Sequence, residues 1–330
     1  MSIKYSILDL ATIRKGDSIQ ETFKKSVKSA QQAEELGYTR YWFSEHHNFE
    51  NVASAATSIL IAHIAAKTEK IRVGSGGIML PNHTTLSIAE QFGTLEGLFP
   101  GRIDLGLGRA PGTDSRTAQV LRRGEAMMNY DFEVHIKELF QYFDAENCFA
   151  SVRAIPGEGC DIPVYILGSS TDSAYLAAKL GLPYAFAAHF APAQMEIAFE
   201  IYKNNYQPSI YLDQPYAMAC LNIIAADTTD EAHYLSQSHF QGFVNILTDQ
   251  RQPLSPPEEN QLDRLSDELR LHLHRMTAKT FIGSPSEIEE QLKEFKNRFN
   301  PDEIIVSGNI YDFQAKLKSN KIAAEVIKSL

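Results

Sequence analysis

Acid–base chemistry is suggested by the tripeptide Glu45-His46-His47. An imidazole can accept or donate a proton near neutral pH, and a neighbouring carboxylate can raise its basicity and fix its tautomer. The apolar run 38–44 predicts a buried strand directly before these residues, so they are expected at its carboxyl end. The pattern alone does not favour this catalytic role, because a structural or substrate-packing histidine at position 46 would fit it equally well.

The same tripeptide contains residue types that bind metal ions. Adjacent residues of an extended strand point to opposite faces, however, so His46 and His47 should not converge on one ion. No H-E-x-x-H spacing occurs in the chain. We therefore expect no metal site.

A second candidate is the glycine-rich run that contains Ser75, Gly76 and Gly77 and interrupts a predicted strand beginning at Ile71. Glycine weakens a strand and usually marks a bulge or the close approach of another group. The run therefore predicts either a tight corner of the sheet or a place where a ligand meets the backbone.

Two segments could hold an anion. Arg109 follows Gly106 and Gly108 at the end of an apolar strand, where small residues allow close approach and a guanidinium can bind a phosphate through two hydrogen bonds. An ordinary surface ion pair is the alternative for Arg109. The surface pair is the preferred interpretation for Arg122 and Arg123.

The other anion-binding candidate is the turn formed by Gly168, Ser169 and Ser170, which leads from a strand into a helix. A helix N-terminus offers free amide donors and the positive end of its dipole. Alone, the serines could be a helix cap only. Together with Arg109, they predict a phosphate-binding cradle.

Apolar runs alternate with helical patterns along the whole chain, which predicts an α/β fold, a (β/α)8 TIM barrel forming one domain over residues 1–330. Insertions are expected at the C-terminal face, at about 109–130, 145–162 and 245–265. Within them, 148–155 could form an added strand and 248–259 is interpreted as mobile. The strands are expected at 3–10, 38–44, 71–74, 103–108, 163–167, 184–188, 216–226 and 303–307.

Charge, cysteine content and the length of apolar runs argue against several classes of function. A net charge of -10 argues against nucleic acid as a partner, because phosphate backbones need a concentrated basic surface. Three scattered cysteines suit a reducing cytoplasm better than a disulfide framework. No stretch has membrane-spanning length and no signal peptide is evident, so we expect a cytoplasmic protein that does not bind membranes.

These motifs together resemble the bacterial luciferase-like flavin-dependent monooxygenases, in particular single-component members similar to a luciferase alpha subunit. The resemblance covers nearly the whole chain and is densest before Asp114. It is carried by Glu45-His46-His47, the run 74–81, Pro100-Gly101-Arg102, Gly108-Arg109 and the run 167–170.

The resemblance assigns roles to residues. It implies that His46, with Glu45, transfers protons beside a flavin ring, and that a cis peptide bond at Gly76-Gly77 lies under that ring. It also implies that Arg109 and the serine pair Ser170 and Ser173 contact the FMN phosphate. The luciferase alpha subunit has a reactive cysteine where this chain has Gly108, which puts efficient light emission in doubt.

The resemblance further implies an FMN-dependent oxidoreductase, a monooxygenase that uses reduced FMN (FMNH2) and dioxygen to oxidise a small organic substrate through a flavin C4a-peroxide. No G-x-G-x-x-G motif follows a strand, so a separate NAD(P)H flavin reductase is expected to supply the FMNH2. A homodimer through the helices at 54–66 and 87–98 is expected from the family. Two alternatives remain: an F420-dependent hydride-transfer enzyme of the same superfamily, and a non-catalytic flavin-binding protein.

Overall fold

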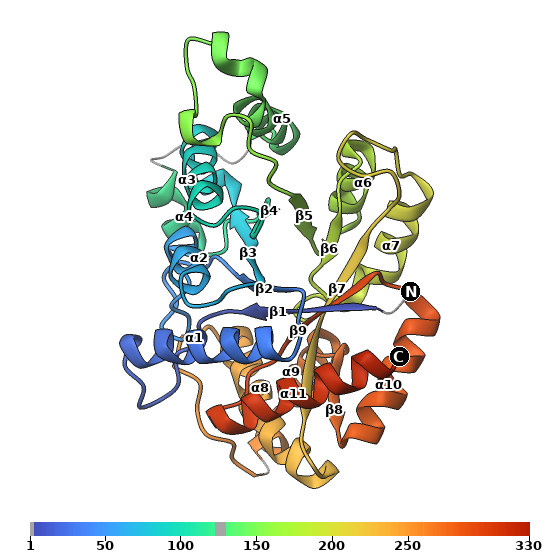
Figure 1. Ribbon diagram of the computed structural model, residues 1–330. Helices are drawn as coiled ribbons and strands as arrows, with labels where there is room; N and C mark the ends of the chain where they lie inside the picture. The colour runs from blue at the N-terminus through green and yellow to red at the C-terminus, as the bar shows by residue number, and fades with distance from the viewer. Residues whose placement is uncertain (1–2, 123–129, 260) are drawn as a thin grey trace.

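The computed structural model describes residues 3–122, 130–259 and 261–330 and contains a closed barrel of eight parallel strands (Figure 1). Neighbouring strands pair in chain order, β7 pairs with β9, β9 pairs with β1, and a pairing between β6 and β7 completes the ring. The predicted (β/α)8 TIM barrel is confirmed. Its strands are β1 (Lys4–Asp9), β2 (Arg40–Phe43), β3 (Arg72–Met79), β4 (Ile103–Gly108), β5 (Val164–Gly168), β6 (Tyr184–Phe186), β7 (Ala217–Ala225) and β9 (Glu303–Ser307).

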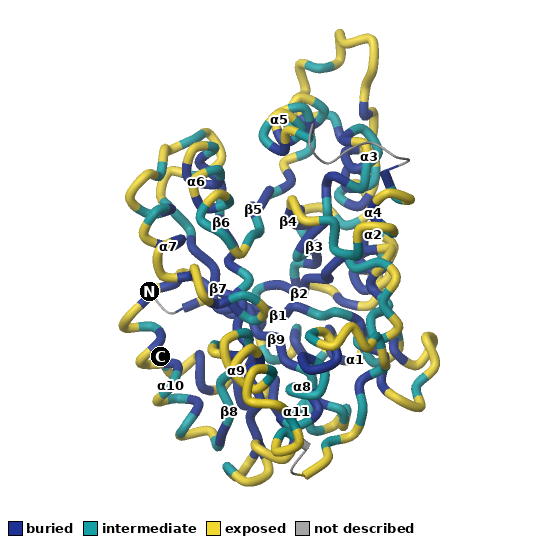
Figure 2. Tube along the Cα trace, turned by 180° about the vertical axis from the view of Figure 1, so that it is seen from behind, coloured by how far each residue is buried: buried dark blue, intermediate teal, exposed yellow. Residues whose placement is uncertain are grey.

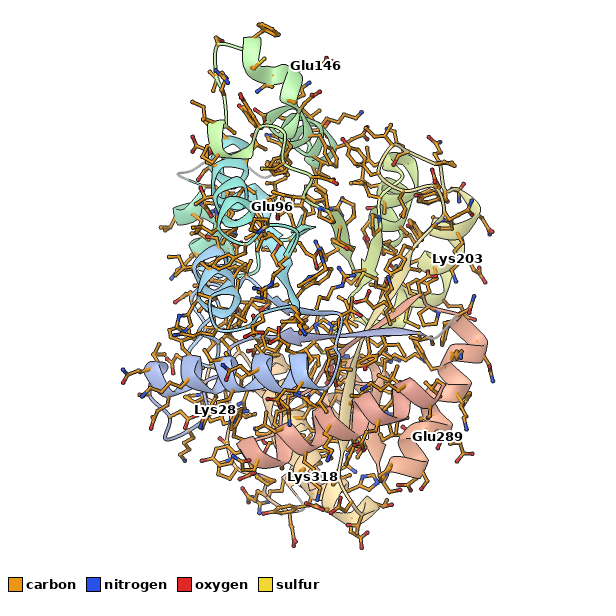
Figure 3. All side chains as sticks on the ribbon, viewed as in Figure 1. Lys28, Glu96, Glu146, Lys203, Glu289 and Lys318 are labelled. Atoms are coloured by element: carbon orange, nitrogen blue, oxygen red, sulfur yellow. The ribbon has the colours of Figure 1, made fainter. Side chains whose placement is uncertain are left out.

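Helices surround the barrel, so buried residues concentrate along the strands and exposed residues along the periphery (Figure 2). Charged side chains such as Lys28 and Glu146 lie at the outer edge of the molecule (Figure 3). Within the described residues, no helix is both long and apolar enough to cross a lipid bilayer. The helices are α1 (Ile19–Glu35), α2 (Thr57–Ala65), α3 (Thr85–Leu98), α4 (Ser115–Leu121), α5 (Phe132–Phe143), α6 (Thr171–Leu180), α7 (Met195–Asn204), α8 (Thr229–Leu247), α9 (Asp267–Met276), α10 (Pro285–Phe299) and α11 (Phe313–Ser329).

Alternation along the strands builds two apolar layers. Tyr41 and Phe43 of β2 belong to the large core between the barrel and the helices, whereas Trp42 belongs to a smaller cluster with Leu8 and Met218. Successive side chains of a strand point to opposite faces, so this division places the smaller cluster inside the barrel. The strands are buried on both faces, which explains their continuous apolar runs.

An ionic network lies at the amino ends of the strands. Arg40, 4% exposed, forms ion pairs with Asp104 at 2.8 Å and Glu303 at 2.9 Å, and both carboxylates are fully buried. Arg72 adds a second cation to Asp104 at 2.7 Å, and the hydroxyl of Tyr216 donates to Glu303 at 2.6 Å. Two carboxylates are thus balanced by two guanidinium groups, as burial of charge requires.

Two details differ from the predictions. A ninth strand, β8 (Thr280–Gly283), pairs with the carboxyl half of β7 and was not expected. The segment 148–155 does not form the added strand; 3-10 turns occupy Ala145–Phe149 and Ile155–Gly157 instead, where Pro156 cannot donate a backbone hydrogen bond. In the segment 248–259, Leu254 forms backbone hydrogen bonds with Ile13 and Lys15, and mobility of the segment stays a prediction.

Replacing Arg40 with methionine is expected to lower the free energy of unfolding by about 3–5 kcal/mol, because Asp104 and Glu303 would each lose a buried partner. Urea denaturation at pH 7 measures this loss. Arg153→Met, which breaks only a surface pair with Glu158, is the matched control and should have a much smaller effect. Equal losses in the two variants would contradict the importance of the buried network.

Candidate active site

The carboxylate of Glu45, immediately after β2, is the centre of a hydrogen-bonded cluster at the carboxyl end of the barrel. It is 1% exposed and accepts hydrogen bonds from His47 Nε2 at 2.8 Å and from His83 Nε2 at 2.9 Å. The backbone N–H of Met79, at the end of β3, donates to it at 3.0 Å. One side chain therefore joins the loops that follow β2 and β3.

This environment keeps Glu45 ionised. Burial alone would raise the pKa of the carboxyl group, but the hydrogen bonds from His47, His83 and the Met79 amide outweigh that effect and lower the pKa to about 2. The carboxylate is consequently a hydrogen-bond acceptor at neutral pH, and it is already fully occupied by its donors.

His46 has a different partner from the one expected. The adjacent carboxylate of Glu45 was expected to fix its tautomer, but it bonds His47 and His83, whereas His46 Nδ1 lies 3.2 Å from the carbonyl oxygen of Gly112. A carbonyl only accepts, so Nδ1 carries the proton and Nε2 is left free to accept one. Burial lowers the pKa of His46 below 6.5, which keeps the ring neutral at pH 7.

Only glycine fits at position 112 without strain. Its φ of +63° favours glycine, and a Cβ there would lie 2.5 Å from the carbonyl oxygen of Glu45. The backbone carbonyl of the same residue accepts from the amide of His47 at 3.2 Å as well as from His46. The loop after β4 is thereby fixed against the loop after β2.

A pocket of about 490 Å³ opens beside His46. Phe49, Val52 and Ala55 give it an apolar lining, and Glu50 and Arg251, the latter from the insertion before α9, also line it. Arg251 donates to the Asn48 carbonyl at 2.8 Å, pairs with Asp114 at 3.1 Å and lies 4.9 Å from the centre of the Phe49 ring. The pocket therefore combines an apolar surface with charged groups of both signs, and its cation is already ion-paired.

The glycine run of β3 brings two strands unusually close together. The register between β3 and β4 shifts between Ser75 and Ile78, so the run marks a bulge, and a Cβ on Gly77 would lie 2.7 Å from the Gly106 carbonyl. The Gly76-Gly77 peptide bond is cis, as the resemblance implies. Ser75 is fully buried, and its hydroxyl bonds only the backbone of Gly106.

The predicted phosphate-binding residues come together between β4 and β5. Arg109 lies at the end of β4 and forms an ion pair at 3.5 Å with Asp172 in the first turn of α6. Ser170 is the N-cap of α6, yet its side chain makes no capping hydrogen bond. Ser169 is exposed, so the helix N-terminus and the guanidinium face a common, accessible region.

Gly168 and Ser173 have mainly structural contacts. A Cβ on Gly168 would overlap the Ser173 hydroxyl, which donates to the Ser170 carbonyl at 2.7 Å and bonds the Tyr184 hydroxyl at 3.0 Å. Ser173 consequently holds the turn in place, and its hydroxyl is already bonded.

Several site residues were not found from the sequence. His83 and Arg251 carried no recognisable motif, although His83 follows β3 closely enough that its position at the carboxyl end could have drawn attention. Arg122 was interpreted as part of a surface ion pair, but it is buried, and none of its guanidinium nitrogens has a partner in the described chain. Arg123 lies outside the described residues. Among those residues, no group of three His, Cys, Asp or Glu side chains could hold a metal ion.

The closed barrel and its site at the carboxyl ends of the strands define a TIM-barrel protein of the kind whose ligands are bound by βα loops. The sequence profile of the luciferase-like monooxygenases matches residues 3–299. The chain therefore belongs to the luciferase-like monooxygenase family.

Individual relatives extend over the whole chain. A luciferase-like monooxygenase of Escherichia coli strain K12 is 46% identical over 100% of this chain and 98% of its own length. The N-acetyl-S-alkylcysteine monooxygenase of Bacillus subtilis strain 168 is 30% identical over 98% of each chain. The crystal structure of apo-MsnO8 has a TM-score of 0.87, with 29% identity over 98% of each chain.

More distant structural neighbours share the fold and differ in cofactor. The oxygenating constituent of 3,6-diketocamphane monooxygenase from Pseudomonas putida, in complex with FMN, has a TM-score of 0.73, with 16% identity over 99% of this chain and 98% of its own. An F420-dependent secondary alcohol dehydrogenase has a TM-score of 0.69, with 12% identity over 99% of each chain. The neighbours thus include both flavin and deazaflavin proteins.

Glu45→Gln is expected to flatten the dependence of stability on pH in acid. The carboxyl pKa is lowered from 4.5 to about 2, so the stabilisation is complete above about pH 4.5 and is lost as the pH falls towards 2. The variant should lose up to about 3 kcal/mol at pH 6. Urea denaturation at pH 6, 5, 4 and 3 measures both effects, and a variant with the wild-type slope would contradict this account.

Proposed function

We propose that this protein is an FMN-dependent monooxygenase that uses reduced FMN and dioxygen to oxidise a small organic substrate. One oxygen atom would enter the substrate and the other would leave as water, with reduced FMN supplying the electrons. The observation that carries the proposal is His46, a neutral imidazole with Nε2 free to accept a proton, held at the carboxyl end of the barrel beside an open pocket.

Separate parts of the site would hold the cofactor. The backbone around Gly76 and Gly77 would lie against the flavin ring, as the resemblance to the family implies. Arg109, with the free amides of Ser169 and Ser170 at the start of α6, would bind the phosphate. Gly168 and Ser173 would shape that turn, and Ser75 would support the ring through the backbone.

Glu45 would act as a positioning residue, not as a proton carrier. Its carboxylate is buried, ionised and occupied by His47 and His83, so it has no vacant acceptor position in the cluster. Its role would be to hold the loops after β2 and β3 so that His46 keeps its orientation.

The substrate pocket would be the one beside His46. Its apolar wall of Phe49, Val52 and Ala55 would contact the body of the substrate, and Arg251 would orient a polar end. The relative that is a monooxygenase of N-acetyl-S-alkylcysteine supports oxygenation of a small organic molecule with both apolar and polar parts.

The proposal also covers the source of reduced FMN, the location of the protein and its oligomeric state. A separate NAD(P)H flavin reductase would supply reduced FMN, and the location would be cytoplasmic, which the free cysteines Cys148, Cys160 and Cys220 support. A homodimer would form through α2 and α3, where Ile59 is 68% exposed and Leu98 is 61% exposed. Light scattering of the purified protein tests the dimer.

His46→Ala is expected to lower the rate of oxygen consumption in the presence of reduced FMN and a turned-over substrate by about 100-fold or more, because the proton acceptor is lost. The wild-type rate should fall as the pH drops through the His46 pKa, which lies below 6.5. An oxygen electrode measures both quantities. His272→Ala, an exposed histidine of α9, is the control, and an unchanged rate in His46→Ala would remove His46 from the mechanism.

The phosphate-binding proposal predicts opposite effects at two residues. Arg109→Ala should weaken FMN binding by about tenfold or more, whereas Asp172→Asn should strengthen it about two- to fivefold, because Asp172 now competes for Arg109 and would repel a phosphate. Anaerobic fluorescence titration with FMN measures the dissociation constants, and Arg116→Ala on exposed α4 is the control.

The same titration with F420 separates the two cofactor classes. Binding of F420 without binding of FMN in either redox state would favour the hydride-transfer alternative. Binding of reduced FMN without oxygen consumption would favour a non-catalytic flavin-binding protein.

A further inference from the structure

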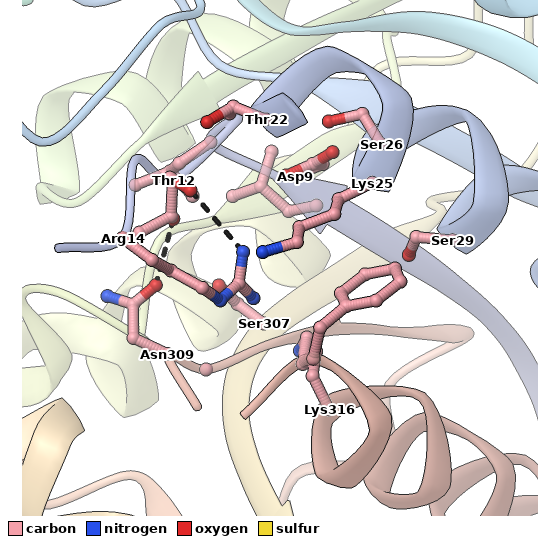
Figure 4. Close-up of a pocket in the computed structure, with 14 residues that line it drawn as sticks. Asp9, Thr12, Arg14, Thr22, Lys25, Ser26, Ser29, Ser307, Asn309 and Lys316 are labelled. Atoms are coloured by element: carbon pink, nitrogen blue, oxygen red, sulfur yellow. Dashed lines mark hydrogen bonds between the residues drawn. The ribbon is translucent and has the colours of Figure 1, made fainter. Parts of the chain in front are cut away.

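A second, smaller cavity lies away from the His46 pocket, at the carboxyl ends of β1 and β9 and beneath α1 and α11 (Figure 4). Its volume is about 40 Å³, roughly three times the minimum that holds a water molecule. The two cavities share no lining residue. Nothing in the proposed oxygenation chemistry uses this second space.

The lining is strongly polar and has an excess of cations. Arg14, Lys25 and Lys316 contribute three positive charges, whereas Asp9 contributes the one carboxylate among its lining residues. Lys25 is neutralised by Asp17, which pairs with it at 2.5 Å from outside the lining. Asp312, also outside the lining, acts electrostatically on Arg14, so the direct partners of each cation decide which of them is open to a ligand.

The cation of the lining that lacks a direct partner is the Lys316 ammonium. Arg14 is held by the backbone carbonyls of Thr12, Ile310 and Tyr311, and Asp9 accepts from the Tyr41 hydroxyl at 2.6 Å. Within the part of the chain that the structure describes, Lys316 Nζ has no hydrogen-bond or ion-pair partner. The side chain is half-buried, so bulk water compensates the missing partner only in part.

Serine hydroxyls also line the cavity. Ser26 of α1 and Ser307 at the end of β9 are each 5% exposed and line the cavity, and neither hydroxyl bonds another group of the described chain. The Phe313 ring lies against Arg14 at 5.6 Å and Lys25 at 5.8 Å, which keeps both cations beside the cavity. A hydroxyl can donate to an anion, and an ammonium neutralises its charge.

The electrostatics of Lys316 agree with this geometry. Burial lowers the pKa of its ammonium to about 8, an effect that Asp9 opposes and Arg14 reinforces. Cys220, also near this group, opposes it as well. A bound anion would stabilise the charged form, since an opposite charge favours the ammonium over the amine.

We propose that this cavity is a binding site for a small oxyanion of one or two negative charges, held by the Lys316 ammonium and the hydroxyls of Ser26 and Ser307. The anion would connect α1, α11 and the ends of β1 and β9. Its binding would stabilise the folded chain, because the unfolded chain has no such site.

Inorganic phosphate is the probe, titrated calorimetrically at constant ionic strength against chloride. The titration uses Arg109→Gln, so that the proposed FMN phosphate region does not contribute. One phosphate is expected per chain. Adding Lys316→Met should weaken binding by at least about tenfold. Lys321→Met, on the same helix and paired only with Glu325, is the matched control and should leave binding unchanged.

Two results would overturn the proposal: no phosphate binding by the Arg109→Gln chain, or equal binding after Lys316→Met. A measurement on the unmodified protein is decisive if the Lys316 variant does not fold. Crystals grown with selenate should show an anomalous peak between α1 and α11 beside Lys316, and absence of that peak would also overturn the proposal.

Discussion

The buried carboxylate of Glu45 is the constraint on which the carboxyl end of this barrel depends. An ionised group with 1% exposure is stable only when donors surround it, and here the donors come from the loops after β2 and β3. Gly112 extends the same framework to the loop after β4 through its carbonyl. Three separate loops are thus fixed to one another by hydrogen bonds of the chain itself, and His46 lies where they meet.

The two ends of the barrel use charge for different purposes. At the amino ends, Arg40 and Arg72 balance Asp104 and Glu303 within the barrel, so the charged groups satisfy one another. At the carboxyl ends, Arg109 is exposed to solvent, Arg251 lines the pocket beside His46, and Lys316 lines the smaller cavity. This division is the common one for such barrels, in which one face gives stability and the other gives chemistry.

Sequence reasoning located the barrel because its strands are buried on both faces and therefore read as continuous apolar runs. It missed β8, a four-residue strand whose residues are mostly half-buried and which gives too short a pattern. It placed Glu45 and His46 correctly at a strand end but assigned them to each other, since neighbours in sequence were taken as neighbours in space. Glu45 instead bonds His47 and also His83, which lies 38 residues further along the chain, and Arg251 reaches Asn48 across 203 residues. Such contacts depend on tertiary packing, which periodicity does not record.

The pairing of β1 with β9 has a consequence for biosynthesis. Lys4 lies opposite Glu303 in the sheet, and Lys328, near the end of α11, lies 5.7 Å from the ring of Tyr5 in β1. A ribosome releases the amino-terminal strand long before the last one has been made, so β1 emerges with one edge lacking its neighbour. The ring cannot close until synthesis has passed β9, and during that interval the nascent chain must shield an open sheet edge from other proteins.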